Sequence, residues 1–197
     1  PLDFYRREDV VQVSRDLLGK VLYTALGGTV TAATITETEA YAGVTDRASH
    51  AHGGRRTRRT EPMFGPGGAA YVYLCYGIHH LFNVVVGEID QPLAILIRAG
   101  EPVVGVRKML ERRNRQLVDT ALLSGPGCLA KGLGITTELS GTSLVGNRIW
   151  IEDQKLSLRQ QDIIAGPRVG VDYAGEDAAL PYRFRVLYSG RLSRQSR

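Results

Sequence analysis

The spacing of apolar residues near the N-terminus predicts a helix followed by a β-hairpin. Apolar side chains recur with helical spacing over residues 10–18, and Gly19 follows where a helix is often closed. Residues 20–26 and 29–39 are rich in β-branched residues and read as strands. The Gly27-Gly28 pair between them is typical of a tight hairpin turn.

The rest of the chain alternates between strand-like and helical patterns. Further strands are predicted at residues 69–76, 81–87, 93–99, 148–152 and 183–188, and helices at residues 103–115 and 127–133. Many of the predicted strands are neighbours in sequence. We therefore expect a mixed α/β (α+β) single domain over residues 1–197, with a curved, mainly antiparallel sheet and surrounding helices.

A polar, glycine-rich stretch over residues 43–68 is too long for an ordinary connection between elements. Loops of that length are usually functional or disordered. This one carries the basic run Arg55-Arg56-Thr57-Arg58-Arg59, which no helix explains as a solvated face. The whole chain of 197 residues has 25 Lys and Arg against 20 Asp and Glu. This balance permits binding to a phosphate backbone without proving it.

Cysteine usage and hydropathy indicate a soluble intracellular protein. Cys75 and Cys128 are too far apart for a Cys-x-x-Cys metal site and too few for a disulfide framework. We expect both thiols to be reduced. No apolar stretch resembles a signal core or a membrane span, so no membrane association is expected.

Two carboxylates, Glu37 and Glu39, stand two residues apart at the end of a predicted strand, where alternation places both on one face. They are either a solvated strand end or a site that activates water. Tyr71 and Tyr73 similarly share one face of their strand, which fits core packing or the stacking of an unpaired base. Together with the basic run, these residues suggest chemistry on a polyanion.

Two alternatives remain open on the residues alone. A metal-dependent hydrolase could use His50, His52 and Glu39, although their spacing and that of His79-His80 fit no standard metal site. A non-catalytic nucleic-acid-binding module could use the tyrosines and arginines as a platform, and it would not need Glu39.

The order of short motifs along the chain resembles the alkyladenine DNA glycosylase family, also called 3-methylpurine DNA glycosylases. The motifs are Glu37-Thr38-Glu39-Ala40-Tyr41, His50, Met63-Phe64, Pro66-Gly67, Tyr71-Val72-Tyr73-Leu74-Cys75-Tyr76-Gly77, Asn83, Ile97-Arg98-Ala99-Gly100-Glu101-Pro102, Ser124-Gly125-Pro126-Gly127 and Arg168-Val169-Gly170-Val171. The resemblance implies a monomeric repair enzyme without metal or cofactor, located with DNA inside the cell. It would flip a damaged purine out of double-stranded DNA and hydrolyse the N-glycosidic bond without cutting the backbone.

The resemblance also implies a role for single residues in the reaction. Glu39 would be the general base that activates water, a task that suits a carboxylate close to the reacting sugar carbon. Arg98 would help to hold that water and a phosphate. The backbone carbonyl of Val169 would supply a further contact.

Other residues correspond to the base pocket and to contacts with DNA. Tyr41 would stack on one face of the flipped base, with His50 and Tyr73 on the other, and Asn83 would obstruct the 2-amino group of guanine. Tyr76 would wedge into the gap left in the duplex. The DNA backbone is expected to contact the arginines of the basic run, Arg55, Arg56, Arg58 and Arg59.

Two positions depart from the family pattern. Cys128 stands where a lysine usually follows Ser-Gly-Pro-Gly, and Thr60 where an asparagine is usual. Both departures bear on DNA affinity and substrate range and leave the base-pocket motifs intact. Residue names do not reveal which lesion is preferred among 3-methyladenine, 7-methylguanine, hypoxanthine and ethenoadenine.

Overall fold

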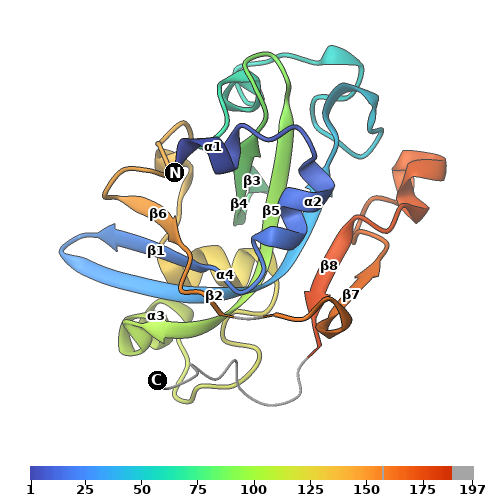
Figure 1. Cartoon of the computed structure of the whole chain (residues 1–197). Coiled ribbons are helices and arrows are strands. Elements are labelled where there is room, and N and C mark those ends of the chain that lie inside the picture. The colour runs from blue at the N-terminus through green and yellow to red at the C-terminus, as the bar shows by residue number, and fades with distance from the viewer. Residues whose placement is uncertain (157, 188–197) are drawn as a thin grey trace.

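A curled antiparallel sheet forms the centre of the molecule (Figure 1). The computed structural model describes residues 1–156 and 158–187. Within these residues the strands are β1 Val21–Leu26, β2 Thr29–Tyr41, β3 Ala70–Cys75, β4 His79–Val86, β5 Leu93–Val104, β6 Ile149–Glu152, β7 Ile163–Gly166 and β8 Arg183–Val186. The order is β3-β4-β5-β2-β1-β6, and β8 pairs with β2 and β7. The predicted mixed α/β class and antiparallel sheet are confirmed.

Strand β2 has more partners than one ordinary strand because its two halves bond different neighbours. It pairs with β5 from Ala32 to Tyr41, with β1 over its first half, and with β8 from Glu37 to Glu39. The β2–β5 register shifts on both sides of Glu37, as a β-bulge produces. The two glutamates therefore lie where β2, β5 and β8 meet.

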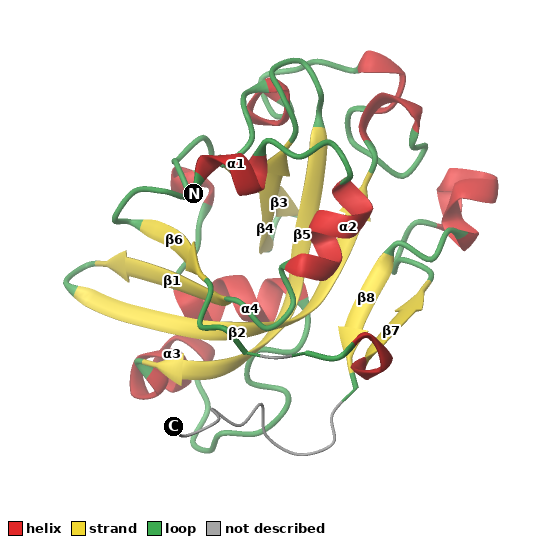
Figure 2. Cartoon of the chain, viewed as in Figure 1, coloured by secondary structure: helices red, strands yellow, loops and turns green. Residues whose placement is uncertain are grey.

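Short helices and turns pack around this sheet (Figure 2). The α-helices are α1 Leu2–Tyr5, α2 Val10–Asp16, α3 Val106–Arg113 and α4 Pro126–Leu133, and the 3₁₀ turns are η1 Gly43–Thr45, η2 His52–Gly54, η3 Glu61–Phe64, η4 Thr137–Leu139, η5 Gln160–Asp162 and η6 Asp172–Ala179. Helix α2 is capped by Asp9, whose carboxylate accepts the N–H of Gln12 at 2.9 Å. None of the helices in the described ranges combines the length and apolar character needed to cross a membrane.

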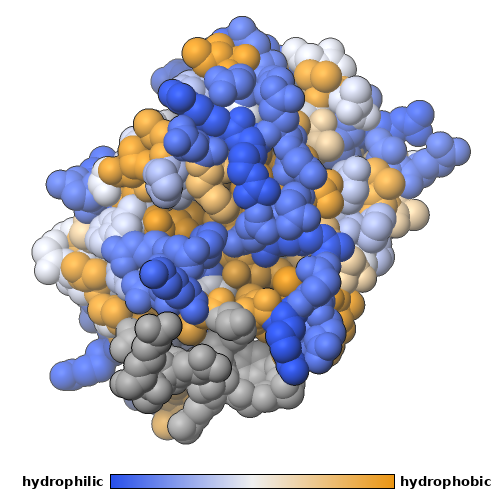
Figure 3. All heavy atoms as spheres, in the orientation of Figure 1, coloured by the Kyte–Doolittle hydropathy of each residue, from blue (hydrophilic) through white to orange (hydrophobic). Residues whose placement is uncertain are grey.

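The main core joins α2, α4 and the sheet. Fully buried side chains include Val13 of α2, Leu17 directly after that helix, Leu133 of α4 and Ile95 of β5. A second buried cluster lies under η3 and includes Met63 and Tyr71. On the face shown in Figure 3, apolar side chains are divided into small groups by polar ones.

Several predicted boundaries move in the structure. Residues 103 and 104 extend β5 and do not begin a helix, because Gly105 adopts a φ of +71° and α3 starts after it. A side chain at position 105 would meet the carbonyl oxygen of Val30 at 2.4 Å. Strand β7 is only four residues long and was not predicted. Residue 188 of the last predicted strand and the basic positions Arg191, Arg194 and Arg197 lie outside the described residues.

The long stretch over residues 43–68 is built from the turns η1, η2 and η3. Its anchor is Asp46, a buried carboxylate that accepts the N–H groups of Ala42 at 2.9 Å and Ala48 at 3.0 Å. The same carboxylate pairs with Arg168, which lies 122 residues further along the chain. The stretch is thus fixed against the C-terminal part of the fold.

Candidate active site

A pocket of about 620 Å³ opens between the β3–β4 hairpin, the start of α4 and the segment 169–173. Its wall contains most of the residues that the sequence singled out, namely Tyr41, His50, Arg59, Tyr73, Tyr76, Asn83, Arg98 and Val169. Glu39 itself is completely buried behind Tyr41, Arg98 and Val169. The fold therefore gathers these residues around one cavity, with the carboxylate under its wall.

The Glu39 carboxylate is held by two hydrogen bonds and one ion pair. One oxygen, Oε1, accepts the backbone N–H of Val169 at 2.8 Å and lies 3.3 Å from Nη1 of Arg98. The other, Oε2, accepts the hydroxyl of Tyr41 at 2.8 Å. The contact from Val169 to the carboxylate is made by its N–H. The further contact that the family resemblance assigns to the Val169 carbonyl stays a prediction.

Glu37 lies on the same face of β2 as Glu39, because both carboxylates contact Arg98. The alternation predicted for the pair is therefore confirmed. Thr38 between them points the other way, and its hydroxyl donates to the carbonyl of Ser14 at 2.9 Å in the core. A single oxygen of Glu37 accepts Nε of Arg98 at 2.9 Å and Nε of Arg183 at 2.6 Å.

Tyr41 is fixed between Glu39 and the buried pair formed by Asp46 and Arg168. The guanidinium of Arg168 lies 4.9 Å from the centre of the Tyr41 ring and 5.3 Å from that of Tyr182. Burial, then the Glu39 charge and hydrogen bond, raise the pKa of Tyr41 well above its ordinary value. The phenol consequently stays protonated and donates to the carboxylate.

His50 is a neutral ring in this site. Its Nδ1 lies 2.9 Å from the Tyr71 hydroxyl, and its Nε2 lies 3.0 Å from Nη2 of Arg59. Because a guanidinium can only donate, Nε2 is the acceptor and Nδ1 carries the proton. Burial, followed by the charges of Arg59 and Arg55, lowers the pKa of His50 from 6.5 to about 4.

The aromatic wall continues from His50 to the β3–β4 hairpin. The Tyr73 ring packs edge-on against His50 with 4.6 Å between ring centres, and Arg59 lies 4.8 Å from the centre of the same ring. Asn83 is buried opposite Tyr71 in the register of the hairpin, and its Nδ2 donates to the Tyr71 carbonyl at 3.1 Å. Asn83 therefore bonds the backbone and lines the pocket at once.

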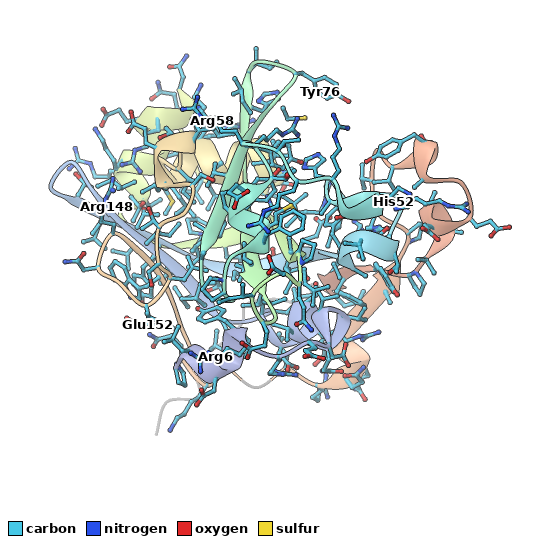
Figure 4. All side chains as sticks on the ribbon, turned by 90° about the horizontal axis from the view of Figure 1, so that it is seen from above. Arg6, His52, Arg58, Tyr76, Arg148 and Glu152 are labelled. Carbon is cyan, nitrogen blue, oxygen red and sulfur yellow. The ribbon has the colours of Figure 1, made fainter. Side chains whose placement is uncertain are left out.

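Tyr76 occupies the tip of the β3–β4 hairpin and is 92% exposed. Its φ of +50° is unusual for a residue other than glycine, and Gly77 follows with a φ of +73°. Ile78 on the same tip is also exposed. In Figure 4, Tyr76 and Arg58 lie in the upper half of the view, whereas Arg6 and Glu152 lie in the lower half.

The arginines of the basic run have different surroundings. Arg56 bonds Glu61 at 2.7 Å and Asp90 at 2.7 Å, and it stacks over Phe64. Arg59 faces the pocket wall, as described above. Arg55 and Arg58 are exposed, and neither forms an ion pair within the described ranges.

The two residues that depart from the family pattern both find hydrogen-bond partners within the fold. Cys128, in the first turn of α4, lines the pocket and accepts Nη2 of Arg113 at 3.0 Å on its sulfur. The Thr60 hydroxyl donates to the Arg55 carbonyl at 3.0 Å and accepts the N–H of Thr57 at 2.8 Å. Thr60 therefore shapes the basic run from within.

Three residues of the site carried no assigned role at the level of sequence: Asp46, Arg168 and Arg183. Arg168 belongs to a family motif, but the chain offers no signal that it pairs with Asp46. Arg183 falls in a predicted strand whose partner could not be read from the sequence. Only the pairing of β8 with β2 brings Arg183 beside Glu37.

Comparisons with known proteins agree with this geometry. A family model described as methylpurine-DNA glycosylase matches residues 3–189. A Bacillus cereus (strain AH820) protein described as "Putative 3-methyladenine DNA glycosylase" is 44% identical over 192 residues, which cover 93% of this chain and 93% of that protein. A Bacillus cytotoxicus protein of the same description is 44% identical over 193 residues, which cover 93% of this chain and 94% of that protein. The chain belongs to the methylpurine-DNA glycosylase family, as its motifs indicated.

Proposed function

We propose that this chain is a monofunctional DNA glycosylase of base-excision repair, working as a monomer with residues 1–197 as one domain. It would flip an alkylated or deaminated purine from double-stranded DNA and hydrolyse the N-glycosidic bond with an activated water. The observation that carries the proposal is the buried Glu39 carboxylate, held by Val169, Tyr41 and Arg98 directly behind an aromatic pocket.

The pocket suits a single flipped base. Its volume of about 620 Å³ lies within the range typical of small-molecule sites. Tyr41 supplies one aromatic wall, and His50 and Tyr73 supply another. Electron-poor purines such as methylated bases stack favourably on such rings. Extrusion of a base costs a few kcal/mol, and the exposed Tyr76 is positioned to fill the vacated space.

Glu39 would serve the reaction in two ways. It would accept the proton of the attacking water, and its negative charge would stabilise the sugar cation that develops as the bond breaks. The carboxylate has no exposed area in this conformation. The attacking water therefore needs an opening between Tyr41, Arg98 and Val169 that forms when DNA binds.

The protonation state of His50 favours lesions whose base leaves the sugar without first receiving a proton from the protein. With a pKa of about 4 and Nε2 occupied by Arg59, the ring has no proton to give at that nitrogen at neutral pH. Purines alkylated at N3 or N7 already carry a positive charge and need no acid. Strand cleavage through a Schiff base would require an amine, and the described residues of the pocket wall include no lysine.

The test is excision from oligonucleotides that each carry one lesion, followed by alkaline cleavage of the abasic strand. The parent should produce alkali-dependent breaks, and Glu39→Gln should lose roughly 10²–10⁴-fold in rate while still binding the lesion duplex. Equal excision by Glu39→Gln and the parent would contradict the assignment. Lesion binding without any base release by the parent would instead support the non-catalytic module, and metal analysis of the active protein tests the hydrolase alternative.

A further inference from the structure

Arg98 is shared between two carboxylates. Its Nε lies 2.9 Å from Glu37, and its Nη1 lies 3.3 Å from Glu39. The guanidinium thus reaches Glu39 with one nitrogen only, although an arginine fork can engage a carboxylate with two parallel hydrogen bonds. The contact with Glu37 ties Nε, and with it the plane of the guanidinium, to the neighbouring carboxylate.

Glu37 is itself fixed by a second cation. The oxygen that accepts Arg98 also accepts Nε of Arg183 at 2.6 Å, and Arg183 stands opposite Glu39 in the β2–β8 register. The side chain of Glu37 is only 13% exposed. The pocket wall contains Arg98 but neither glutamate among the residues that the structure describes. Glu37 therefore has no direct route to a bound base.

The sharing of Arg98 between two carboxylates affects how many hydrogen bonds Glu39 can still accept. A carboxylate offers about four lone-pair positions. Val169 and Tyr41 occupy two of them with hydrogen bonds, and Nη1 of Arg98 forms an ion pair with the same carboxylate at 3.3 Å. If Arg98 donated two hydrogen bonds to Glu39, both remaining positions would be filled, and the water would have no acceptor.

The charges of the four side chains in this cluster support the same role for Glu37. Glu37 and Glu39 balance Arg98 and Arg183 within this cluster. Loss of the Glu37 charge would leave two arginines beside one carboxylate. The excess positive charge would oppose a developing sugar cation.

We propose that Glu37 is a positioning residue for the glycosylase reaction. It anchors Arg98 so that one acceptor position of Glu39 remains for the attacking water, and Arg183 anchors Glu37 in turn. The inference rests on the proposed function, because it concerns the water that Glu39 would activate.

The test is single-turnover base release by Glu37→Gln, beside lesion-duplex binding and thermal melting. We expect the rate to fall about 10- to 100-fold, less than the loss from removing the general base, while affinity stays within about twofold. In a Glu39→Gln background the same substitution should cause no further loss, because both residues act on one water. A purely structural role would lower the rate equally in both backgrounds.

Asp16→Asn is the matched control. This carboxylate also accepts from two side chains, Arg7 at 2.6 Å and Gln12 at 2.8 Å, but it lies on α2 away from the pocket. The base-release rate of Asp16→Asn should equal that of the parent. If Glu37→Gln fails to fold, Arg183→Gln carries the test, with a loss of about threefold or more expected from the loosened anchor.

The outcomes separate the two proposals. If the parent is active and Glu37→Gln releases base at the parental rate, the role of Glu37 alone is overturned. The same result for Arg183→Gln, where it replaces Glu37→Gln, has the same meaning. Equal losses in the parental and Glu39→Gln backgrounds overturn it as well. A parent that releases no purine from any lesion overturns the proposed function and this inference together.

Discussion

At the scale of single residues, Asn83 is the clearest case of a side chain under two constraints. Its amide donates to the Tyr71 carbonyl across the β3–β4 hairpin, and it also lines the pocket. The structure therefore shows the backbone bond that a purely structural role would require. It shows equally that the side chain lines the pocket, in which the proposed function places the flipped purine.

Shortening Asn83 to Ser separates these roles. The variant should open room for the 2-amino group of guanine and release guanine from a G·T mismatch, where extrusion costs least. The measurement is guanine release beside hypoxanthine release, with a melting curve on the same preparation. Val86→Ala in the core part of β4 is the control for lost stability alone. A decline of all activities in step with melting temperature, as in that control, would leave Asn83 a structural residue.

At the scale of elements, the basic run and the hairpin tip define the edge expected to meet DNA. Thr60 fixes the backbone of the run through Arg55 and Thr57. Arg58 lies in the same half of the view as Tyr76 (Figure 4). Arg56 lies in the same run but is already bonded to Glu61 and Asp90.

Arg58→Ala and Arg56→Ala should therefore differ in their dependence on salt. Each lost phosphate contact reduces the log–log salt slope of binding by about 0.9. We expect that change for Arg58→Ala, on damaged and undamaged duplex alike, and an unchanged slope for Arg56→Ala. Binding titrations across a range of salt concentrations measure both slopes. An equal reduction by the two variants would show that DNA displaces the acidic partners of Arg56.

Local patterns allowed most elements to be predicted, because strands and helices leave a periodicity in sequence. The Gly27-Gly28 turn, α2 and α4 follow from such signals. The start of α3 was misplaced because the apolar pair at 103–104 fits either a strand or a helix, and pairing with β2 decides for the strand.

The residues of the candidate site could be predicted from the family motifs, but the hydrogen bonds and ion pairs between them could not. Contacts such as Asp46 with Arg168 and Glu37 with Arg183 join distant segments, and no local pattern encodes them. The same limit applies to Arg56 and Arg58, which look alike in sequence. The residues around them in space differ, and we therefore expect the two arginines to differ in their contacts with DNA.

At the scale of the whole molecule, the pair formed by Asp46 and Arg168 joins the long stretch after β2 to the segment that carries Val169. Both side chains are fully enclosed, at 1% and 0% exposure. Arg168 also donates to the carbonyls of Ala40 at 3.0 Å and Asp177 at 3.1 Å. A buried charge held in this way depends on its partner.

Asp46→Asn should lower the free energy of unfolding by about 3–5 kcal/mol, because the Arg168 guanidinium would remain buried without its counter-charge. Urea denaturation measures the loss. Glu61→Gln, which breaks an exposed pair with Arg56, should leave the urea midpoint unchanged. Similar midpoints for the two variants would mean that Arg168 finds water or another partner when Asp46 is neutralised.

The groups around Glu39 come from two separate stretches of the polypeptide. Arg98 and Tyr41 belong to strands made early, whereas Val169 and Arg183 belong to the last part of the described chain. During synthesis, Glu39 and Arg98 are therefore made well before the N–H of Val169 that the Glu39 carboxylate accepts. The bonds around Glu39 are completed only when the segment that carries Val169 and the strand β8 reach β2. The same segment supplies Val169 and Tyr173 to the pocket wall, so the pocket and the contacts behind it are completed together.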